Sequence, residues 1–443
     1  MNIQKKIKSN IYKSKQDSHL KELLKGSAVS VFFRILSILS GYFLFYILAK
    51  YFGADGVGFF STMWTLIMVS VVFSKMGFDT SIVRYIAEFS KKSEFHNIAI
   101  IYTKSFIFIT LSGILVMVLI LVFSKSLSLI FFKTSEYSKY IVYLSFVILP
   151  LTFLNFNAES QKALKKITVY SILQNGSINL FLAFILFSII LFQWSTGKAM
   201  IVNSLIITII CLMLISFIFV FKNIGFSKTN FNFPFTNKQI LKTTLPMLLS
   251  NSLFLVMNWT DILMLSGFKT ATDVGIYNTS LKIASISTIV LIGINTIAMP
   301  KYAELKNEHL RFRKFVKQTT FLIILSSLPI FIGIMLFPDI LLGIFGNEFI
   351  VGKTTLLILA VGMFFSAISG STVHILNMTG QEKIVQNILL ISAGFNFILN
   401  FILIPIYGIN GAAIATASTT IFWNLTTQWF IYKKFKFVTF PFI

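Results

Sequence analysis

Long apolar runs separated by short polar breaks dominate the chain. The apolar windows predict twelve helical spans, at about residues 26–49, 58–77, 99–123, 139–158, 168–192, 199–221, 243–265, 276–298, 317–337, 355–376, 385–405 and 411–431. Helical runs of about 20 residues match a hydrocarbon core about 30 Å thick, whereas the strands of a membrane barrel read as alternating segments of ~10 residues. Strict alternation is absent from this sequence. The pattern therefore predicts an all-α polytopic membrane protein.

Composition agrees with this class. The 443 residues are 56% hydrophobic and only 12% charged, whereas soluble domains carry about 25% charged residues. The apolar run after residue 25 has no small-residue cleavage site and is longer than a signal-peptide core, so we expect a retained first helix. The single cysteine, Cys211, lies in an apolar segment, which excludes a disulfide framework and a cysteine-based metal motif.

The net charge of +23 comes from basic residues that are concentrated in alternate loops. Of the 38 Lys and Arg residues, 28 fall in the N-terminal segment and in the loops on the same side as it, and 7 fall on the other side. The positive-inside rule therefore predicts cytoplasmic N- and C-termini. Because topology accounts for the charge, the charge does not indicate a nucleic-acid partner.

The two halves of the chain repeat each other. Gly77-Phe-Asp-Thr80 recurs as Gly293-Ile-Asn-Thr296, and Val57-Gly58 after an aspartate recurs as Val274-Gly275 after another. Six spans separate the copies, so they have the same orientation, as in parallel repeats that rock about a site between them. We therefore expect a basic cytoplasmic N-terminal segment (1–25), an N-lobe (26–221), a cytoplasmic inter-lobe loop (222–242), a C-lobe (243–431) and a cytoplasmic C-terminal tail (432–443).

Enzyme motifs are absent from the sequence. It has no Walker-type phosphate loop and no HExxH, and its four histidines are scattered without metal-ligand spacing. The hydrophilic loops are too short to fold a catalytic domain. We therefore expect no catalytic residues, no metal and no cofactor, and a membrane transporter instead.

Two arginines are candidate substrate contacts. Arg34 lies in the first span on a face shared with serines and Gly41, which cannot point at lipid. It is about 12 Å from the inner end of the span, so it either snorkels or pairs, or it faces the substrate. Arg84, at the cytoplasmic end of the second span, either receives substrate or belongs to an interfacial charge cluster.

The seventh span contains the deepest carboxylate. Asn251, Asn258 and Asp261 share one helix face, and a carboxylate inside a membrane helix is by default functional. Lys282 in the next span lies at a similar depth. The two either form a salt bridge across a helical hairpin, or form a site that opens to admit an anion or to take a proton at Asp261.

Small and polar residues also form stripes in the later spans, for example Ser366 and His374 in the tenth and Thr416 and Thr420 in the twelfth. Such stripes mark close helix packing more often than ligand binding.

Several motifs together resemble a known family. They are Gly77-Phe-Asp-Thr-Ser-Ile-Val-Arg84-Tyr-Ile-Ala-Glu88, Thr260-Asp-Ile-Leu-Met-Leu-Ser-Gly267, Asp273-Val-Gly-Ile-Tyr-Asn278, Pro300-Lys-Tyr-Ala-Glu304 and Tyr407-Gly-Ile-Asn-Gly-Ala-Ala-Ile-Ala-Thr416. In order and placement, these motifs are similar to those of the Wzx-type O-antigen flippases of the multidrug, oligosaccharidyl-lipid and polysaccharide exporter superfamily. The resemblance extends over nearly the whole chain.

The resemblance implies a V-shaped molecule of two six-helix lobes in the bacterial inner membrane. Such a protein flips an undecaprenyl-diphosphate-linked oligosaccharide to the outer leaflet by alternating access, beside a polysaccharide polymerase and chain-length machinery. A diphosphate in a low dielectric needs cationic partners, for which Arg34, Arg84 and Lys282 are the candidates.

Two other functions stay open on the sequence. A cation-coupled drug antiporter of the same superfamily would need a carboxylate-lined site, and Asp261 is the one deep carboxylate. An O-antigen polymerase or ligase would need a large outer loop, and the longest outer segment, near 338–354, is itself half apolar. Fold analogy cannot decide among these functions, so the residues of the cavity must.

Overall fold

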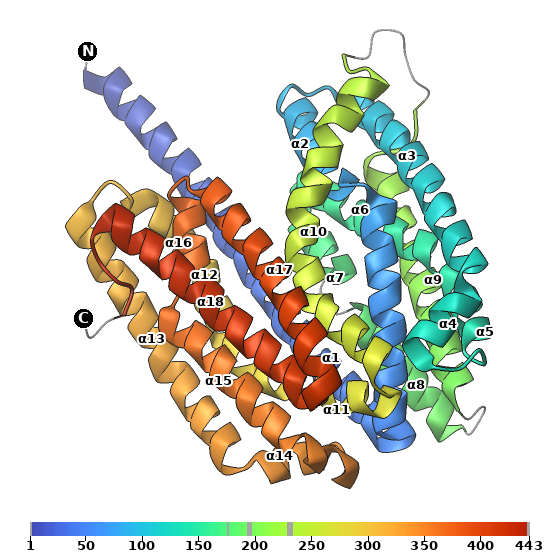
Figure 1. The fold of residues 1–443 in the computed structure, drawn as a ribbon. Helices are drawn as coiled ribbons and strands as arrows, with labels where there is room; N and C mark the ends of the chain where they lie inside the picture. Colours follow the sequence, from blue (N-terminus) through green and yellow to red (C-terminus); the bar gives the residue numbers. More distant parts are fainter. Residues whose placement is uncertain (1, 175–176, 193–196, 228–233, 441–443) are drawn as a thin grey trace.

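Figure 1 shows the computed structural model of the chain, in which two helical bundles are connected by long helices. The structure describes residues 2–174, 177–192, 197–227 and 234–440, without the side chains of 2–31, 245–247, 249–258 and 296–297. Within these ranges every residue lies in a helix or in a connection between helices, and none lies in a strand. The predicted all-α class is confirmed.

The helices are α1 (Asn2–Lys75), α2 (Phe78–Lys91), α3 (Phe95–Val122), α4 (Ser124–Phe132), α5 (Ser138–Ser145), α6 (Ile148–Ala163), α7 (Ile167–Gln174), α8 (Ser177–Leu191), α9 (Lys198–Asn223), α10 (Asn237–Phe268), α11 (Ala271–Ala284), α12 (Ile286–Leu305), α13 (His309–Leu336), α14 (Pro338–Gly343), the 3₁₀ helix η1 (Asn347–Gly352), α15 (Lys353–Ser369), α16 (Thr372–Met378), α17 (Glu382–Tyr407) and α18 (Ile409–Phe435). Each of the twelve predicted spans falls on one or two of these helices.

Fewer than twelve helices qualify as single membrane spans. Over the described residues, seven helices are long and apolar enough to cross a membrane, or nine if each of two bent pairs is one span. One reason is that α1 contains the first two predicted spans, because the chain reverses direction at Gly53 inside it (Figure 1). Gly53 has φ 65°, a left-handed conformation that glycine adopts without the strain of a Cβ.

The two bundles converge at one end and diverge at the other. The second half of α1 and α2 to α9 form the first bundle, α12 to α18 form the second, and α10 and α11 lie between them (Figure 1). The converging end holds α11 and the Gly53 bend, which the positive-inside rule places outside. The diverging end is the predicted cytoplasmic end.

Two glycines allow α1 and α11 to cross at the converging end. A Cβ on Gly58 would overlap the carbonyl oxygen of Ala271, and a Cβ on Gly275 would overlap the carbonyl oxygen of Ala54. Within each helix the alanine precedes the glycine by four residues, as Ala54 precedes Gly58 and Ala271 precedes Gly275. The contact is therefore a reciprocal crossing of two small-xxx-small motifs. The repeated sequence thus makes a pseudo-symmetric contact between the two halves.

Hydrogen bonds strengthen this contact. The bend at Gly53 deprives the next backbone N–H of a helical acceptor, and the Ala54 N–H donates instead to the Glu348 carboxylate of η1, at 2.7 Å. Deeper along the same crossing, the Asn278 amide donates to the Ser61 hydroxyl at 2.6 Å. The molecule is therefore closed at its predicted outer end.

At the predicted cytoplasmic end, α10 begins on the first bundle. The chain before α10 packs on that bundle, with the Phe235 ring 5.2 Å from Tyr85 and 6.0 Å from Phe89. Gly77, with φ 81°, lies so close to the start of α10 that a Cβ would be 2.5 Å from the Thr244 carbonyl oxygen. Farther along, α10 packs on α17 of the second bundle, so it connects one bundle to the other.

We expect the substitution Gly58→Ala to open the outer crossing, because its Cβ has no room beside the Ala271 carbonyl. The measurement is labelling by a membrane-impermeant thiol reagent of a cysteine placed at the buried Ser61, in a Cys211→Ser background. The labelling rate should rise severalfold in Gly58→Ala. The matched control is Gly267→Ala, where nothing lies within 4 Å of the new methyl group. Equal labelling of these two variants, both monodisperse after purification, would contradict the role of the crossing.

Candidate functional site

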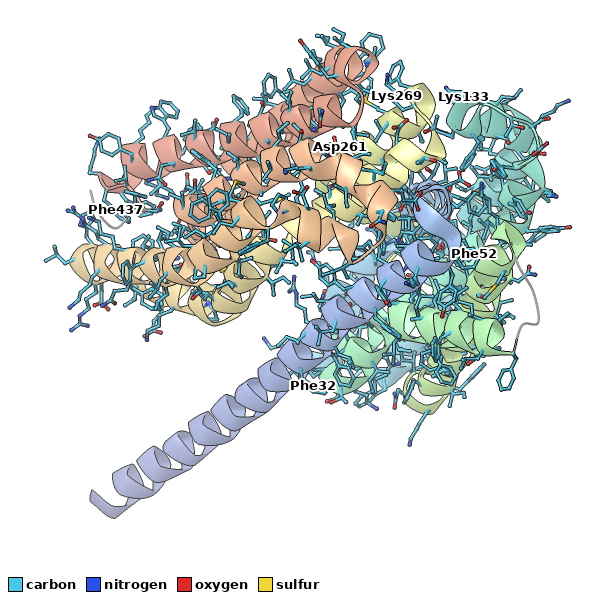
Figure 2. The ribbon with its side chains drawn as sticks, turned by 90° about the horizontal axis from the view of Figure 1, so that it is seen from below. Phe32, Phe52, Lys133, Asp261, Lys269 and Phe437 are labelled. Atoms are coloured by element: carbon cyan, nitrogen blue, oxygen red, sulfur yellow. The ribbon has the colours of Figure 1, made fainter. Side chains whose placement is uncertain are left out.

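Asp261 is the centre of a buried polar cluster at which four helices meet. Its side chain is 3% exposed on α10, and Oδ1 accepts hydrogen bonds from the amides of Asn400, at 2.6 Å, and Asn396, at 3.2 Å. Oδ2 accepts from the Tyr277 hydroxyl at 2.9 Å and from the Thr416 hydroxyl. These donors come from α17, α11 and α18. Figure 2 shows Asp261 in the interior, among these helices.

The expected salt bridge between Asp261 and Lys282 is absent from the described side chains, none of which forms an ion pair with either residue. The physical reason is the geometry of α11. Tyr277 on this helix points at Asp261, whereas Lys282, five residues later, points across at α1. Of the two alternatives for this pair, the salt bridge across the hairpin is therefore excluded, and both charges lie in the interior without an opposite charge in contact among the described side chains.

The cluster can accept one positive charge. The oxygens of Tyr277 and Thr416 lie 3.0 Å apart, and both also contact Oδ2 of Asp261. The three oxygens, of Tyr277, Thr416 and Asp261, are thus in mutual contact and could form three hydrogen bonds. The two hydroxyl groups supply hydrogens for only two of these bonds. A proton on Asp261 would supply the third hydrogen. The buried Oδ1 of Asn400 has no hydrogen-bond donor among the described groups, and amide oxygens suit a hard cation. One carboxylate matches a proton or a single monovalent cation in charge.

A cavity of about 500 Å³ opens beside the cluster. Its wall is formed by α10, α11, α12, α15, α17 and α18, all of which follow the inter-lobe loop. The lining residues are Asp261, Asn278, Leu281, Lys282, Ser285, Thr288, Leu291, Ile292, Met363, Ser366, Asn396, Thr416, Thr419, Thr420 and Trp423. The wall combines apolar side chains with a few convergent polar groups, as ligand sites do.

Lys282 supplies the positive charge of this wall. Its Nζ lies 3.8 Å from the ring centroid of Phe45 and 5.5 Å from that of Tyr42, both on α1. The ammonium group also lies beside Gly41 of α1, where a Cβ would be 3.5 Å from Nζ, an ordinary van der Waals distance. The Tyr42 hydroxyl also fixes the α11 backbone by donating to the Lys282 carbonyl at 2.6 Å. Cation–π contacts hold the ammonium group but leave its N–H groups available to an anion.

Arg34 lies farther along the same side of α1. It is exposed, and it is near enough to Tyr170 of α7 and His374 of α16 to act on both electrostatically. Gly41 and Phe45 follow Arg34 by seven and eleven residues, which are about two and three helical turns. The three residues therefore share a helix face. The two cations therefore follow one side of α1, Arg34 toward the predicted cytoplasmic end and Lys282 toward the closed end.

Of the other predicted residues, only Arg84 has a described side chain, and it does not join this site. Arg84 is exposed on α2 and does not line the cavity. Asn251 and Asn258 lie outside the described side chains. Sequence reasoning missed Tyr277, Asn396 and Asn400 as partners of Asp261. A signal for the last two exists, because these asparagines, four residues apart, share one face of the otherwise apolar second half of α17.

Comparison with known proteins gives a consistent result. The family model described as "Polysaccharide biosynthesis protein" matches residues 23–306, and the model described as MatE matches residues 246–402. A probable low-salt glycan biosynthesis flippase, Agl15 of Haloferax volcanii, is 30% identical over 163 residues, which are 36% of this chain and 34% of that protein. A putative O-antigen transporter of Shigella flexneri is 25% identical over 185 residues, or 41% of this chain and 44% of that protein. The chain thus matches between a third and a half of the length of these relatives.

Solved structures share the fold. The lipid II flippase MurJ in an inward closed conformation superposes with a TM-score of 0.74 at 15% identity, over 93% of this chain and 89% of that one. An inward-facing multidrug resistance transporter of the MATE family gives 0.73 at 13% identity, over 93% of this chain and 98% of that one. At these identities the likeness concerns the fold alone.

The hydrogen bonds to Asp261 should contribute measurably to the free energy of unfolding, so we expect the loss of a single donor to destabilise the protein. Tyr277→Phe removes one hydrogen bond to a buried carboxylate, so we expect a loss of about 1.5–3 kcal/mol in the free energy of unfolding. Thermal unfolding in detergent micelles measures the change. Tyr407→Phe is the control, because Tyr407 is 57% exposed and its hydroxyl bonds to no described group. An unchanged melting temperature for Tyr277→Phe would show that the hydrogen bond contributes nothing.

Proposed function

Because the chain belongs to the polysaccharide biosynthesis protein family of the multidrug, oligosaccharidyl-lipid and polysaccharide exporter superfamily, we propose that it is a flippase for a lipid-linked oligosaccharide. Its substrate would be a glycan on undecaprenyl diphosphate, moved from the cytoplasmic to the outer leaflet. The observation that carries the proposal is Lys282, a cation of the cavity wall that has no carboxylate partner among the described side chains, in a molecule that is closed at its predicted outer end.

The charges of the cavity fit a diphosphate. An anion that leaves water needs charge-assisted hydrogen bonds, and an ammonium group held over aromatic rings can supply up to three. Arg34, exposed on the same side of α1, would meet the diphosphate first, and Lys282 would hold it at the end of the path. The hydroxyl and amide groups of the wall would replace water around the sugar, and the polyprenyl chain would stay in the bilayer.

The conformation fits the loading step. The bundles are closed where the Gly58 and Gly275 crossing lies, and they diverge toward the end that the positive-inside rule makes cytoplasmic. A substrate assembled on the cytoplasmic face would enter from that end. Rocking of the two halves would then close the cytoplasmic end and release the outer crossing.

The arrangement of Asp261 argues against a drug antiporter. A cationic drug would need access to the carboxylate, but four neutral donors already occupy its oxygens. A proton or a small cation can join the cluster without displacing them. Asp261 is therefore proposed as the coupling site, with the energy of an ion gradient driving the movement of the glycan lipid.

The test of substrate binding is transport by purified protein in sealed vesicles, scored by protection of the sugar from an external reagent. Lys282→Ala should lower the transport rate at least about tenfold, and Arg34→Ala should lower it too, because each removes a cation from the diphosphate's path. Lys282→Arg should retain part of the rate. The control is Lys125→Ala, an exposed lysine outside the cavity. Transport of cationic dyes but of no lipid-linked sugar by the wild type would favour the antiporter function instead.

Coupling through Asp261 is tested in the same vesicles with imposed gradients of protons or of sodium. The wild-type rate should respond to one of these gradients. Asp261→Asn keeps the size of the side chain but cannot take up a positive charge, so its rate should not respond to either gradient. An Asp261→Asn protein with full transport at every pH and full response to the gradients would exclude the coupling role.

A further inference from the structure

Trp423 lies on the cavity-facing side of α18. Thr416, Thr420 and Trp423 are four and three residues apart and line the same cavity. Thr416 contacts Asp261, and Trp423 comes seven residues later, about 10 Å along the helix toward the predicted cytoplasmic end. The indole therefore lies on the side of the Asp261 cluster from which a substrate would come.

The indole of Trp423 has no fixed partner among the described side chains. No described side chain stacks on its ring or accepts a hydrogen bond from its N–H, although the residue is only partly exposed. Another tryptophan of α18 differs: Trp429 packs 4.7 Å from Phe430, with the Lys433 ammonium 5.3 Å from its ring centroid. A partly buried tryptophan usually finds a partner for its N–H, so an unpartnered indole in a cavity wall is available to a ligand.

Free hydroxyl groups surround the same part of the wall. The hydroxyls of Thr420 and Ser366 make no hydrogen bond with any described group, and Thr420 is only 5% exposed. The hydroxyl of Thr419 donates to its own helix at 2.7 Å and keeps an acceptor site. Each free hydroxyl can both donate and accept.

These groups select among the three parts of a lipid-linked glycan. A diphosphate needs cations, and among the described lining residues the one Lys or Arg is Lys282, which lies toward the closed end. A polyprenyl chain needs only apolar surface and would leave the free hydroxyls and the indole N–H without partners, which is costly. A sugar ring offers an apolar face of C–H groups and a rim of hydroxyls, which match an aromatic ring and neighbouring hydroxyl groups.

We propose that Trp423, with Thr420 and Ser366, binds a sugar ring of the substrate by stacking on its C–H face. This inference rests on the proposed function and adds the part of the protein that distinguishes a glycosylated lipid from a bare one. The sugar next to the diphosphate would lie against Trp423 while Lys282 holds the diphosphate.

Two short-chain probes test the proposal by binding to purified protein: a polyprenyl diphosphate that carries a hexose disaccharide, and the same polyprenyl diphosphate without sugar. Trp423→Leu should weaken binding of the glycosylated probe about tenfold and leave binding of the bare probe unchanged. Trp423→Phe, which keeps a ring, should lose less. The matched control is Trp429→Leu on the same helix, at a position 54% exposed, which should bind both probes like the wild type.

Fluorescence gives a second readout. The chain has five tryptophans, so replacing Trp64, Trp194, Trp259 and Trp429 by Phe leaves Trp423 as the one reporter. Its emission should change with the glycosylated probe and not with the bare one.

The failures of the two proposals are distinguishable. Equal weakening of both probes by Trp423→Leu, or of neither, overturns the sugar contact while leaving the flippase function intact. Equal affinity of the wild type for the two probes overturns it as well. If the wild type binds neither probe, the proposed function itself fails, and the sugar contact with it.

Discussion

A carboxylate that is removed from water inside a helical bundle needs hydrogen-bond donors around it, and this requirement organises the second half of the chain. Asp261 on α10 receives donors from the next helix, α11, and from α17 and α18, more than 130 residues later in the sequence. A buried charge without these donors would cost several kcal/mol. The cluster therefore determines how α10, α11, α17 and α18 are placed against one another, and with them the wall of the cavity.

One short helix connects this cluster to the contact between the bundles. Within eight residues, α11 carries Gly275 at the outer crossing, Tyr277 at Asp261, Asn278 at Ser61 and Lys282 in the cavity. Gly275, Asn278 and Lys282, three and four residues apart, face α1, whereas Tyr277 faces the other way. A change of charge at Asp261 would act on the crossing through Tyr277, and an anion at Lys282 would act on it through the same helix. Differential binding at either place thus shifts one equilibrium, as coupling between two ligands requires.

The fold could be predicted from the sequence much further than the site could. Helical spans follow from local apolar runs, and the repeated Val-Gly pairs, whose Gly58 and Gly275 meet at the outer crossing, are visible in the sequence, because each is a property of a short segment. The partners of Asp261 depend instead on which helices are neighbours, and Asn396 and Asn400 lie more than 130 residues from it. Depth alone suggested that Lys282 would pair with Asp261. The two side chains do not meet, because Lys282 leaves α11 in the direction of α1. The depth of a residue along its helix does not reveal this direction.

The separation of Asp261 from Lys282 has a functional consequence. A salt bridge between them would have satisfied both charges permanently, and an anionic substrate would then have had to break it. Neutral donors satisfy Asp261 instead, and aromatic rings hold Lys282, so each group can gain a charged ligand without losing a charged partner. The cavity can consequently take up an anion at one position and a small cation at the other. The proposed flippase would bind the diphosphate lipid at one position and the coupling ion at the other, and α11 is the element that connects the two positions.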